Sequence, residues 1–296
     1  MDTIILIMQA GTLFIFGTMG EVLSQRSGVL NLGLEGMMVV GSLAGFAAAT
    51  LSGNPWIGLA AAMIAGGLMS LIHGFIVITL RQSQVVSGMA LTIFGLGLTA
   101  YVGKHFLMVG APPRLPTIVY GVTPLLFLGL ALVPLTWFVL YRTRFGLTVR
   151  AVGEDPEAAD TAGINVARVR YICVFIGGMM AGLAGAYLSL AYSPMWREGM
   201  TAGRGWICIA LAFFSMWRPT MVLIGAELFG GLWILQFKLQ GMDIPVISRV
   251  FASPYLLMMI PYLVTVLIVT LVMSNEKLRK RIGGPAALGV PYERSS

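Results

Sequence analysis

The sequence predicts an all-α, polytopic transmembrane helix bundle, and three observations carry this prediction. Hydrophobic residues make up 57% of the 296 residues, charged residues only 10%, and the mean hydropathy is +0.88. A soluble domain carries about 25% charged residues. Open strands cannot satisfy their backbone groups in lipid, so each span is expected to be a helix. A span needs roughly 20 apolar residues, so we expect about nine spans, within a range of eight to ten.

Apolar runs and the polar breaks between them predict where the spans lie. The expected spans are 3–23, 29–50, 55–80, 83–103, 123–141, 169–192, 204–217, 219–238 and 254–273. The seventh is short for a full crossing, so it and the eighth could form a tilted or broken pair. Small residues at four-residue spacing let transmembrane helices approach closely. Such residues are Gly41 and Gly45, then Gly66, Ser70 and Gly74, and finally Gly178 and Gly182.

The distribution of basic residues predicts the orientation, because Lys and Arg favour cytoplasmic loops. With the N-terminus outside, 13 of the 19 Lys and Arg fall in inside segments and six fall outside. The strongest inside markers are the loop 142–168 and the tail sequence EKLRKR. We therefore expect a transmembrane domain over residues 1–275 and a cytoplasmic tail over 276–296. The chain is expected to be a multi-pass membrane protein.

The polar segment between the fifth and sixth spans has the sequence pattern of a short helix. Asp155 can cap it, and Pro156 suits the first helical position, where no intrahelical N–H bond is needed. Glu157 lies where the helix dipole favours negative charge. Gly163 can take the left-handed conformation that ends the helix, and Asn165 could cap the next one. A short capped helix outside the bilayer is suited to docking a cytosolic partner.

Polar groups within the membrane are costly and are candidates for function. Glu21 and Glu35 flank a Gly-rich stretch that contains Asn31 and Gly33. This pattern at the start of an apolar run predicts a broken helix that lines a cavity. Asn31 and Glu35 are four residues apart, so we expect them to share a helical face. The alternatives are that Glu21 is merely interfacial and that Glu35 pairs with a basic group and orders the bundle.

Three further residues could line a solute path. Gln84 and Ser87 place polar groups along the fourth span, with span-edge polarity as the alternative. Arg204 opens the seventh span, where it could face an aqueous pathway or extend to the membrane surface. The candidate substrate-path residues are therefore Asn31, Glu35, Gln84, Ser87 and Arg204.

Several function classes lack the residues that they need. The net charge of +7 is spread over loops, which the positive-inside rule explains better than nucleic-acid binding. His73 and His105 have no partner at metal-ligand spacing, and the two cysteines fall in apolar runs. The dipeptide Gly103-Lys104 lacks the glycine of a phosphate-binding loop. We expect no metal or cofactor in this chain, so any ATP would be bound by a partner.

Three segments carry a family resemblance. They are RSGVLNLGLEGMMVVGSLAGF (26–46), GEDPEAADTAGINVARVRY (153–171) and AGRGWICIALAFF (202–214). They resemble the inner-membrane permeases of ABC importers, in the simple-sugar and nucleoside branch related to branched-chain amino acid and ribose permeases. The similarity spans roughly residues 10–275 and implies a multi-pass protein of the bacterial inner (plasma) membrane. The family pattern is more Gly-rich where this chain has SMWRP (215–219).

The resemblance implies a set of partners and coupling residues. It implies a cytoplasmic ABC ATPase that binds ATP and Mg, and a groove of this ATPase that seats the loop helix as a coupling helix. It also implies a second permease subunit, either a homologue or a second copy, and an extracytoplasmic substrate-binding protein or lipoprotein. With the capping residue included, the expected ATPase-coupling residues are Gly153, Asp155, Pro156, Glu157, Ala158, Ala159 and Gly163.

These observations lead to one hypothesis and two rivals. The hypothesis is a non-catalytic, membrane-spanning subunit of an ATP-driven importer that forms the path for a nucleoside or simple sugar by alternating access. A stand-alone secondary transporter or channel for a small polar solute would need coupling-ion ligands, such as paired carboxylates. Glu21, Glu35 and Glu227 do not obviously pair. An intramembrane enzyme would need a nucleophile–base set or metal ligands.

Overall fold

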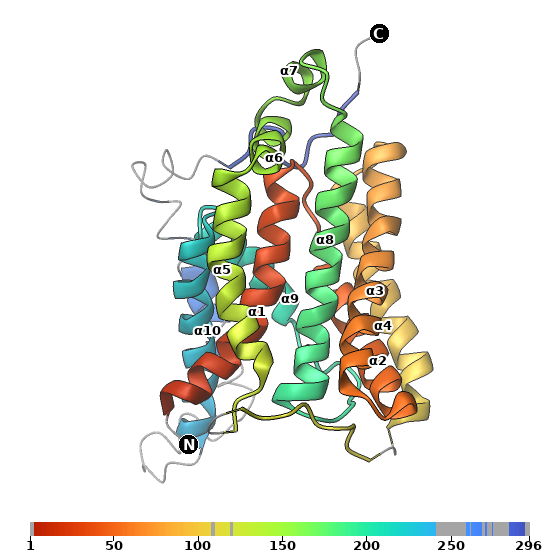
Figure 1. The fold of residues 1–296 in the computed structure, drawn as a ribbon, viewed down its shortest axis with the longest axis vertical. Coiled ribbons are helices and arrows are strands. Elements are labelled where there is room, and N and C mark those ends of the chain that lie inside the picture. Colours follow the sequence, from red (N-terminus) through yellow and green to blue (C-terminus); the bar gives the residue numbers. More distant parts are fainter. Residues whose placement is uncertain are drawn as a thin grey trace.

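The computed structural model describes residues 3–107, 110–118, 121–240, 259–260, 262–267, 270, 274 and 284–293. Within this part of the chain every regular element is a helix, and the long helices run side by side along one axis (Figure 1). Seven are long and apolar enough to cross a membrane. They are α1 (Thr3–Arg26), α2 (Leu34–Ser52), α3 (Pro55–Gly74), α4 (Gln84–Gly103), α5 (Pro124–Arg142), α8 (Val166–Tyr187) and α10 (Pro219–Gln240). The predicted all-α polytopic bundle is confirmed.

Three of these helices continue into a tighter or wider final turn. The elements η1 (Phe75–Thr79) and η3 (Leu188–Tyr192) are π-helical and extend α3 and α8, whereas η2 (Lys104–Phe106) is a 3-10 turn that extends α4. The added residues lengthen the three spans to 25, 23 and 27 residues. A straight α-helix of that length exceeds the roughly 30 Å of a bilayer core.

The helix at the seventh predicted span is only about half as long as a membrane crossing requires. Helix α9 (Arg204–Phe214) has 11 residues, about 16 Å of helix, whereas the bilayer core is about 30 Å thick. The ninth predicted span, 254–273, lies largely outside the described residues, although 262–267 are helical. The tail sequence EKLRKR lies outside them entirely. The described residues thus hold seven full-length spans and one half-length helix.

The second span begins later than its hydrophobicity predicts. Residues 27–33 form a loop, and α2 begins only at Leu34. Gly28 has φ +89°, and the side chain of Asn31 accepts the backbone N–H of Gly33 at 3.0 Å, which closes a local turn in place of a helical one. Asn31 therefore shares no helical face with Glu35, and that prediction was wrong.

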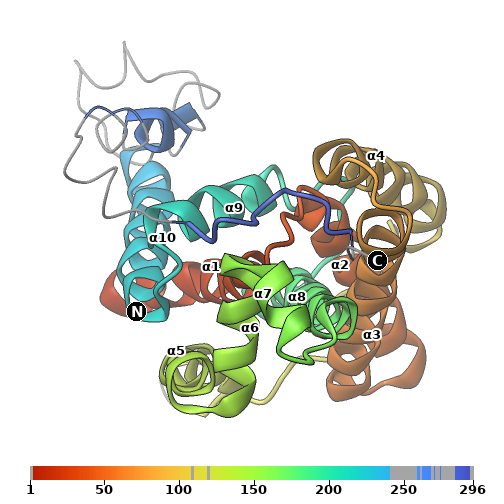
Figure 2. The same ribbon diagram turned by 90° about the horizontal axis from the view of Figure 1, so that it is seen from above.

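Helix α8 is the centre of the bundle and packs along α1, α2 and α3 (Figure 2). Small residues permit this packing. A Cβ atom on Gly178 would overlap Ser70, and one on Gly41 or Gly66 would overlap the backbone of α8. The predicted role of these small residues in close helix approach is confirmed.

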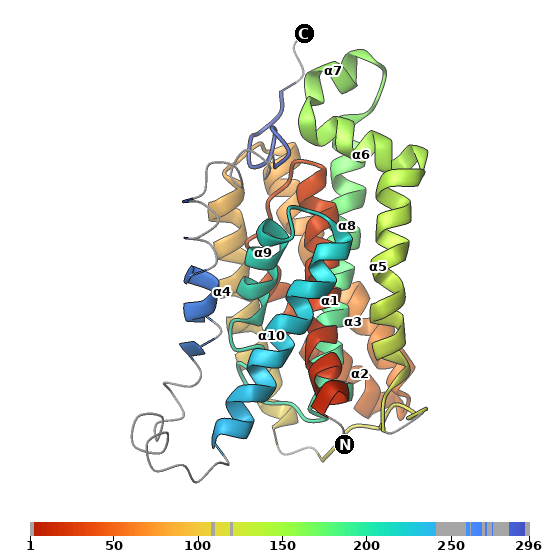
Figure 3. The ribbon, with the colours of Figure 1, turned by 90° about the vertical axis from the view of Figure 1, so that its left-hand side faces the viewer.

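Two short helices project beyond the long ones at one end of the bundle (Figure 3). They are α6 (Arg144–Glu154) and α7 (Pro156–Thr161). The sequence predicted only α7. Helix α6 forms because the Thr143 hydroxyl caps its first turn and because Val149 and Val152 share a buried face.

The C-terminal segment 284–293 lies at the same end as α6 and α7. The N–H of Ala287 donates to the carbonyl of Gly153 at 3.0 Å, and the N–H of Gly289 donates to the carbonyl of Gly28 at 3.2 Å. This segment therefore joins α6 to the loop 27–33.

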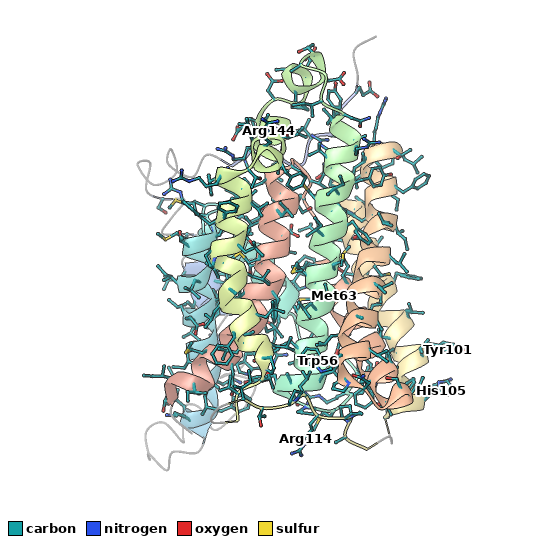
Figure 4. The ribbon with its side chains drawn as sticks, viewed as in Figure 1. Trp56, Met63, Tyr101, His105, Arg114 and Arg144 are labelled. Carbon is teal, nitrogen blue, oxygen red and sulfur yellow. The ribbon has the colours of Figure 1, made fainter. Side chains whose placement is uncertain are left out.

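The opposite end of the bundle carries the start of α1 and a set of aromatic and basic side chains. Figure 4 shows Arg144 at the α6 end and places Trp56, Tyr101 and Arg114 at the other end. Trp56 and Tyr101 are exposed, as expected for aromatic residues at a membrane–water boundary.

Candidate functional site

The short helix α7 has each local feature that the sequence predicts. Asp155 Oδ1 accepts the N–H of Ala158 at 2.9 Å, and Pro156 occupies the first helical position. Gly163 has φ +83°, in the left-handed region. Asn165 Oδ1 accepts the N–H of Arg168 at 2.9 Å and caps α8. The predicted capping scheme is confirmed.

The expected coupling residues divide into an outward and an inward set. Asp155, Glu157, Ala158 and Gly163 are exposed, and Pro156 is half-buried. The remaining two, Ala159 and Gly153, point into the structure. Ala159 is buried, and a Cβ atom on Gly153 would overlap the carbonyl oxygen of Arg26. The outward set is therefore available to a partner, and the inward set holds α6 and α7 on the bundle.

The Glu35 carboxylate joins the N-terminal ends of two helices. It lies in the first turn of α2 and is 4% exposed. Its Oε1 accepts the Thr201 hydroxyl at 2.6 Å and the Gly203 N–H at 2.8 Å, while its Oε2 accepts the Gly205 N–H at 2.6 Å. Both helix N-termini favour this negative charge and α9 gains a cap from a distant residue. Glu35 therefore holds the half-length helix in place.

Arg204 follows this junction but does not pair with Glu35 within salt-bridge distance in the described part of the chain. Its Nη1 donates to the carbonyls of Met200 at 2.7 Å and Thr201 at 3.1 Å. Its Cζ lies 3.9 Å from the centroid of the Trp233 ring, a cation–π contact. With 8% of its surface exposed, Arg204 does not extend to the membrane surface.

A cavity of about 360 Å³ opens beside Arg204, at the end of α8 and α10 that lies away from α7. Ordinary ligand pockets fall in the range of about 300–1,000 Å³. Its lining combines aromatic rings with basic donors and includes Tyr192, Trp233, Phe237, Arg197 and Arg204. Such a lining can stack on a ring and donate hydrogen bonds to hydroxyl groups.

Gln84 and Ser87 lie elsewhere, at the loop 27–33. Gln84 Oε1 accepts the N–H of Leu30 at 2.7 Å. His73 bridges the carbonyl of Leu30, 3.1 Å from Nε2, and the hydroxyl of Ser87, 3.0 Å from Nδ1. The Thr92 hydroxyl donates to the carbonyl of Leu32 at 3.0 Å. These side chains hold an irregular backbone inside the bundle, where water is scarce. His73, a lone histidine in sequence, was not predicted to take part.

Glu21 supports the same loop from α1. It is fully buried within the bundle. Its Oε1 accepts Gln25 Nε2 at 2.7 Å and the N–H of Asn31 at 3.3 Å. Gln25 Oε1 in turn accepts the indole N–H of Trp217 at 2.6 Å. This chain of buried contacts connects the loop to the turn between α9 and α10.

The five candidate path residues therefore form two groups rather than one. Gln84 contacts the loop 27–33 directly, and Ser87 contacts it through His73. Glu35 and Arg204, in contrast, lie at the junction between the starts of α2 and α9. Asn31 precedes all four in the chain and is buried within the loop 27–33. Among the described residues no group of three or more His, Cys, Asp and Glu side chains could hold a metal ion.

Comparisons with known proteins agree on one family. A family model described as "Branched-chain amino acid transport system / permease component" matches residues 3–271. The "Putative glucose ABC transporter permease protein TsgC13" of Haloferax volcanii is 39% identical, over 97% of this chain and 96% of the relative. The guanosine ABC transporter permease protein NupQ of Bacillus subtilis is 35% identical, over 94% and 92%.

A nucleoside relative and a solved structure extend the comparison. The nucleoside ABC transporter permease protein NupC of Lactococcus lactis is 32% identical, over 96% of this chain and 94% of the relative. The solved structure "An inward-facing conformation of a putative metal-chelate type ABC transporter" has a TM-score of 0.51 at 14% identity. It covers 88% of this chain and 84% of its own, and this likeness concerns the fold.

The family match decides between the hypotheses drawn from the sequence. Family members are non-catalytic, integral inner-membrane subunits of ABC transporters, and ATP is hydrolysed by a partner ATPase. The predicted transport permease and its membrane location are confirmed, and the rival classes are set aside. With a family model matched over residues 3–271 and full-length relatives up to 39% identical, this chain belongs to the branched-chain amino acid transport system permease family of ABC transporter subunits.

Proposed function

We propose that this chain forms the membrane path of an ATP-driven importer for a nucleoside or simple sugar. The observation that carries the proposal is α7, a capped six-residue helix held beyond the membrane spans with Glu157 and Ala158 exposed. Relatives that match along the whole chain are named as permeases for glucose, guanosine and nucleosides. The transmembrane domain would cover residues 1–275, with a tail over 276–296.

Motion of α7 would reach the bundle through α6. Gly153 packs against the backbone of Arg26 at the end of α1, and its carbonyl accepts the N–H of Ala287. A cytoplasmic ABC ATPase that binds ATP and Mg would close on α7 and shift α6. Because α6, the end of α1 and the loop 27–33 are in contact, this shift would change the packing around the broken start of α2. Asp155, Pro156 and Gly163 keep the shape of α7 during this motion.

The solute would enter at the other end, where the cavity beside Arg204 lies. Tyr192 and Trp233 can stack on a sugar or a base, and Arg204 and Arg197 can donate to hydroxyl or carbonyl oxygens. A substrate-binding protein or lipoprotein would deliver the solute here, and a second permease subunit, homologue or copy, would complete the path. The N-terminus would then be outside and the α6–α7 end inside. Asn31, Glu35, Gln84 and Ser87 would support the broken helices that border the path.

The test is an exposed substitution on α7 with a matched control. Ala158→Arg places a bulky cation on α7, while Ala111→Arg makes the same change in an exposed loop at the opposite end. We expect Ala158→Arg to abolish co-purification of the ATPase and uptake of labelled guanosine or glucose, with normal membrane insertion. Ala111→Arg should leave ATPase co-purification intact. Wild-type co-purification and uptake by the Ala158→Arg variant would refute the docking assignment.

A further inference from the structure

The α6–α7 end of the bundle has a second cavity, which the transport proposal does not use. It measures about 420 Å³ and lies between the end of α1, the end of α5 and the start of α10. Its lining is basic and aromatic, and consists of Arg26, Trp137, Tyr141, Arg218 and Thr220. Among the described residues, no acidic side chain lines it.

Two further arginines surround the aromatic wall of this cavity. The Cζ of Arg142 lies 5.6 Å from the centroid of the Trp137 ring, and the Cζ of Arg150 lies 5.2 Å from that of Tyr141. The Arg150 Nε is buried and has no hydrogen-bond partner in the described part of the chain. The positive charge is therefore concentrated around the two rings.

None of these arginines forms an ion pair with a carboxylate of the described residues. In the described ranges the single ion pair is that of Arg81 with Glu293, outside this cavity. Arg26 donates only to neutral oxygens, namely the Tyr141 hydroxyl and the carbonyls of Met216 and Trp217, all at 3.4 Å. The start of α10 borders this cavity through Thr220, and the positive end of the helix dipole adds to the potential there. The cavity thus has the charge of an anion site, and the part of the chain that the structure describes supplies no anion to it.

The position of the cavity favours a lipid over a free anion. Helices α1, α5 and α10 are membrane spans, and all three begin or end here, so the cavity lies at headgroup depth. Along α5 and α10 the surface next to it is apolar and exposed, with Leu135 at 55% and Ile224 at 62%. Figure 2 shows α5 and α10 on the same side of the bundle, with α1 between them.

We propose that this cavity binds the phosphate headgroup of an anionic glycerophospholipid, such as a phosphatidylglycerol, with its acyl chains along α5 and α10. The arginines supply charge-assisted bonds to the phosphate, and Trp137 and Tyr141 occupy the glycerol level. Basic pockets between transmembrane helices at the cytoplasmic face are suited to such headgroups.

The experiment compares lipid binding by purified full-length protein in nanodiscs and by native mass spectrometry. Arg218→Gln removes an exposed charge of the lining, and Arg142→Gln removes the exposed charge beside the Trp137 ring. Arg144→Gln is the control, because Arg144 is exposed but is neither part of the lining nor one of the arginines beside its two rings. Each cavity variant should retain phosphatidylglycerol about fivefold less well than wild type, because each basic residue near an anionic surface contributes about that factor. The Arg144→Gln variant should retain phosphatidylglycerol as well as wild type does, and all variants should bind phosphatidylcholine equally.

Three outcomes would overturn the proposal. One is wild-type retention of phosphatidylglycerol by both cavity variants. Another is an equal loss in Arg144→Gln, which would mean a diffuse surface charge. The third is stabilisation and lipid displacement by inorganic phosphate alone at millimolar concentration, which would mean a free-anion site. Equal unfolding midpoints of all variants in phosphatidylcholine nanodiscs would show that the fold is intact.

Discussion

The Glu35 carboxylate and the Gly205 backbone N–H, 170 residues apart in the chain, are joined by a 2.6 Å hydrogen bond. Gly205 can approach this closely only because it lacks a side chain, since a Cβ atom would lie 2.6 Å from the Glu35 Cα. The bond fixes the start of the half-length helix α9 against the start of α2. Any rearrangement of the solute path has to move these two helix ends together or break this contact.

The first prediction concerns the charge of Glu35. In Glu35→Gln an amide NH₂ replaces one carboxylate oxygen and faces a backbone donor. We expect the free energy of unfolding to fall by about 1–3 kcal/mol and uptake to fall with it. Thermal unfolding in detergent and uptake of labelled nucleosides and sugars measure both. Glu198→Gln, at an exposed acidic residue of the same loop, is the control. A change of substrate preference at unchanged stability would instead assign Glu35 to the solute path itself.

The second prediction concerns the close packing of α8. Gly182→Ala forces a methyl group onto the backbone of α3, whereas nothing lies within 4 Å of a Cβ atom on Gly97. We expect Gly182→Ala to lower the free energy of unfolding by about 1–3 kcal/mol. Gly97→Ala should be neutral or slightly stabilising, because alanine favours a helix over glycine. Equal unfolding midpoints of the two variants would contradict the packing argument.

The third prediction concerns the turn between α9 and α10. Met216 and Trp217 have φ +53° and +52°, a left-handed conformation that costs about 1–2 kcal/mol per residue for side chains other than glycine. Met216→Gly removes this strain but adds about 0.5–1 kcal/mol of chain entropy. We expect a net gain of about 0.5–1 kcal/mol, measured by the unfolding midpoint. Ser215→Gly, at φ −73°, should only destabilise. A loss of stability in Met216→Gly would show that its side chain outweighs the strain.

The fourth prediction concerns orientation. With the α6–α7 end inside, Thr161→Cys should resist a membrane-impermeant thiol reagent in intact cells and react in lysed cells. Glu198→Cys should react in intact cells. Glu198 is a better probe position than its neighbour Gly199, because Gly199 has φ +62°, where a cysteine would be strained. The native Cys173 and Cys208 are buried, so background labelling should be low. The reverse labelling pattern would invert the topology.

Local chemistry explains why the sequence predicts α7 well. Asp155, Pro156, Gly163 and Asn165 act on groups within three residues of themselves, so their roles can be inferred from the sequence alone. Helix α6 could have been predicted from the sequence in the same way, because Thr143 can cap it and Val149 and Val152 share a face. Several charged residues in 144–154 instead favoured the prediction of a loop there.

The contacts around the broken helices could not be inferred in that way. Glu35 bonds to residues 166 to 170 positions away, and Trp217 bonds to Gln25 across 192 positions. Apolar residues on both sides of 27–33 suggested a span that began at residue 29, but polar partners from α3 and α4 stabilise an irregular loop there. In the turn at 215–219 Met216 and Trp217 are left-handed, a conformation that glycine takes at no steric cost.

The segment 284–293 imposes an order on biosynthesis. Its bonds to Gly153 and Gly28 join parts of the chain that leave the ribosome much earlier. At about 5–20 residues per second, it follows α7 by on the order of ten seconds. During that interval Gly153 of α6 and Gly28 of the loop 27–33 lack the hydrogen bonds that this segment donates to them. An ATPase that bound α7 in this window would meet a docking end that packs on the end of α1 through Gly153 but lacks the added hydrogen bonds of 284–293. Productive assembly should therefore occur after translation of the permease, which ribosome-bound nascent chains of defined length can test by their ability to capture the ATPase.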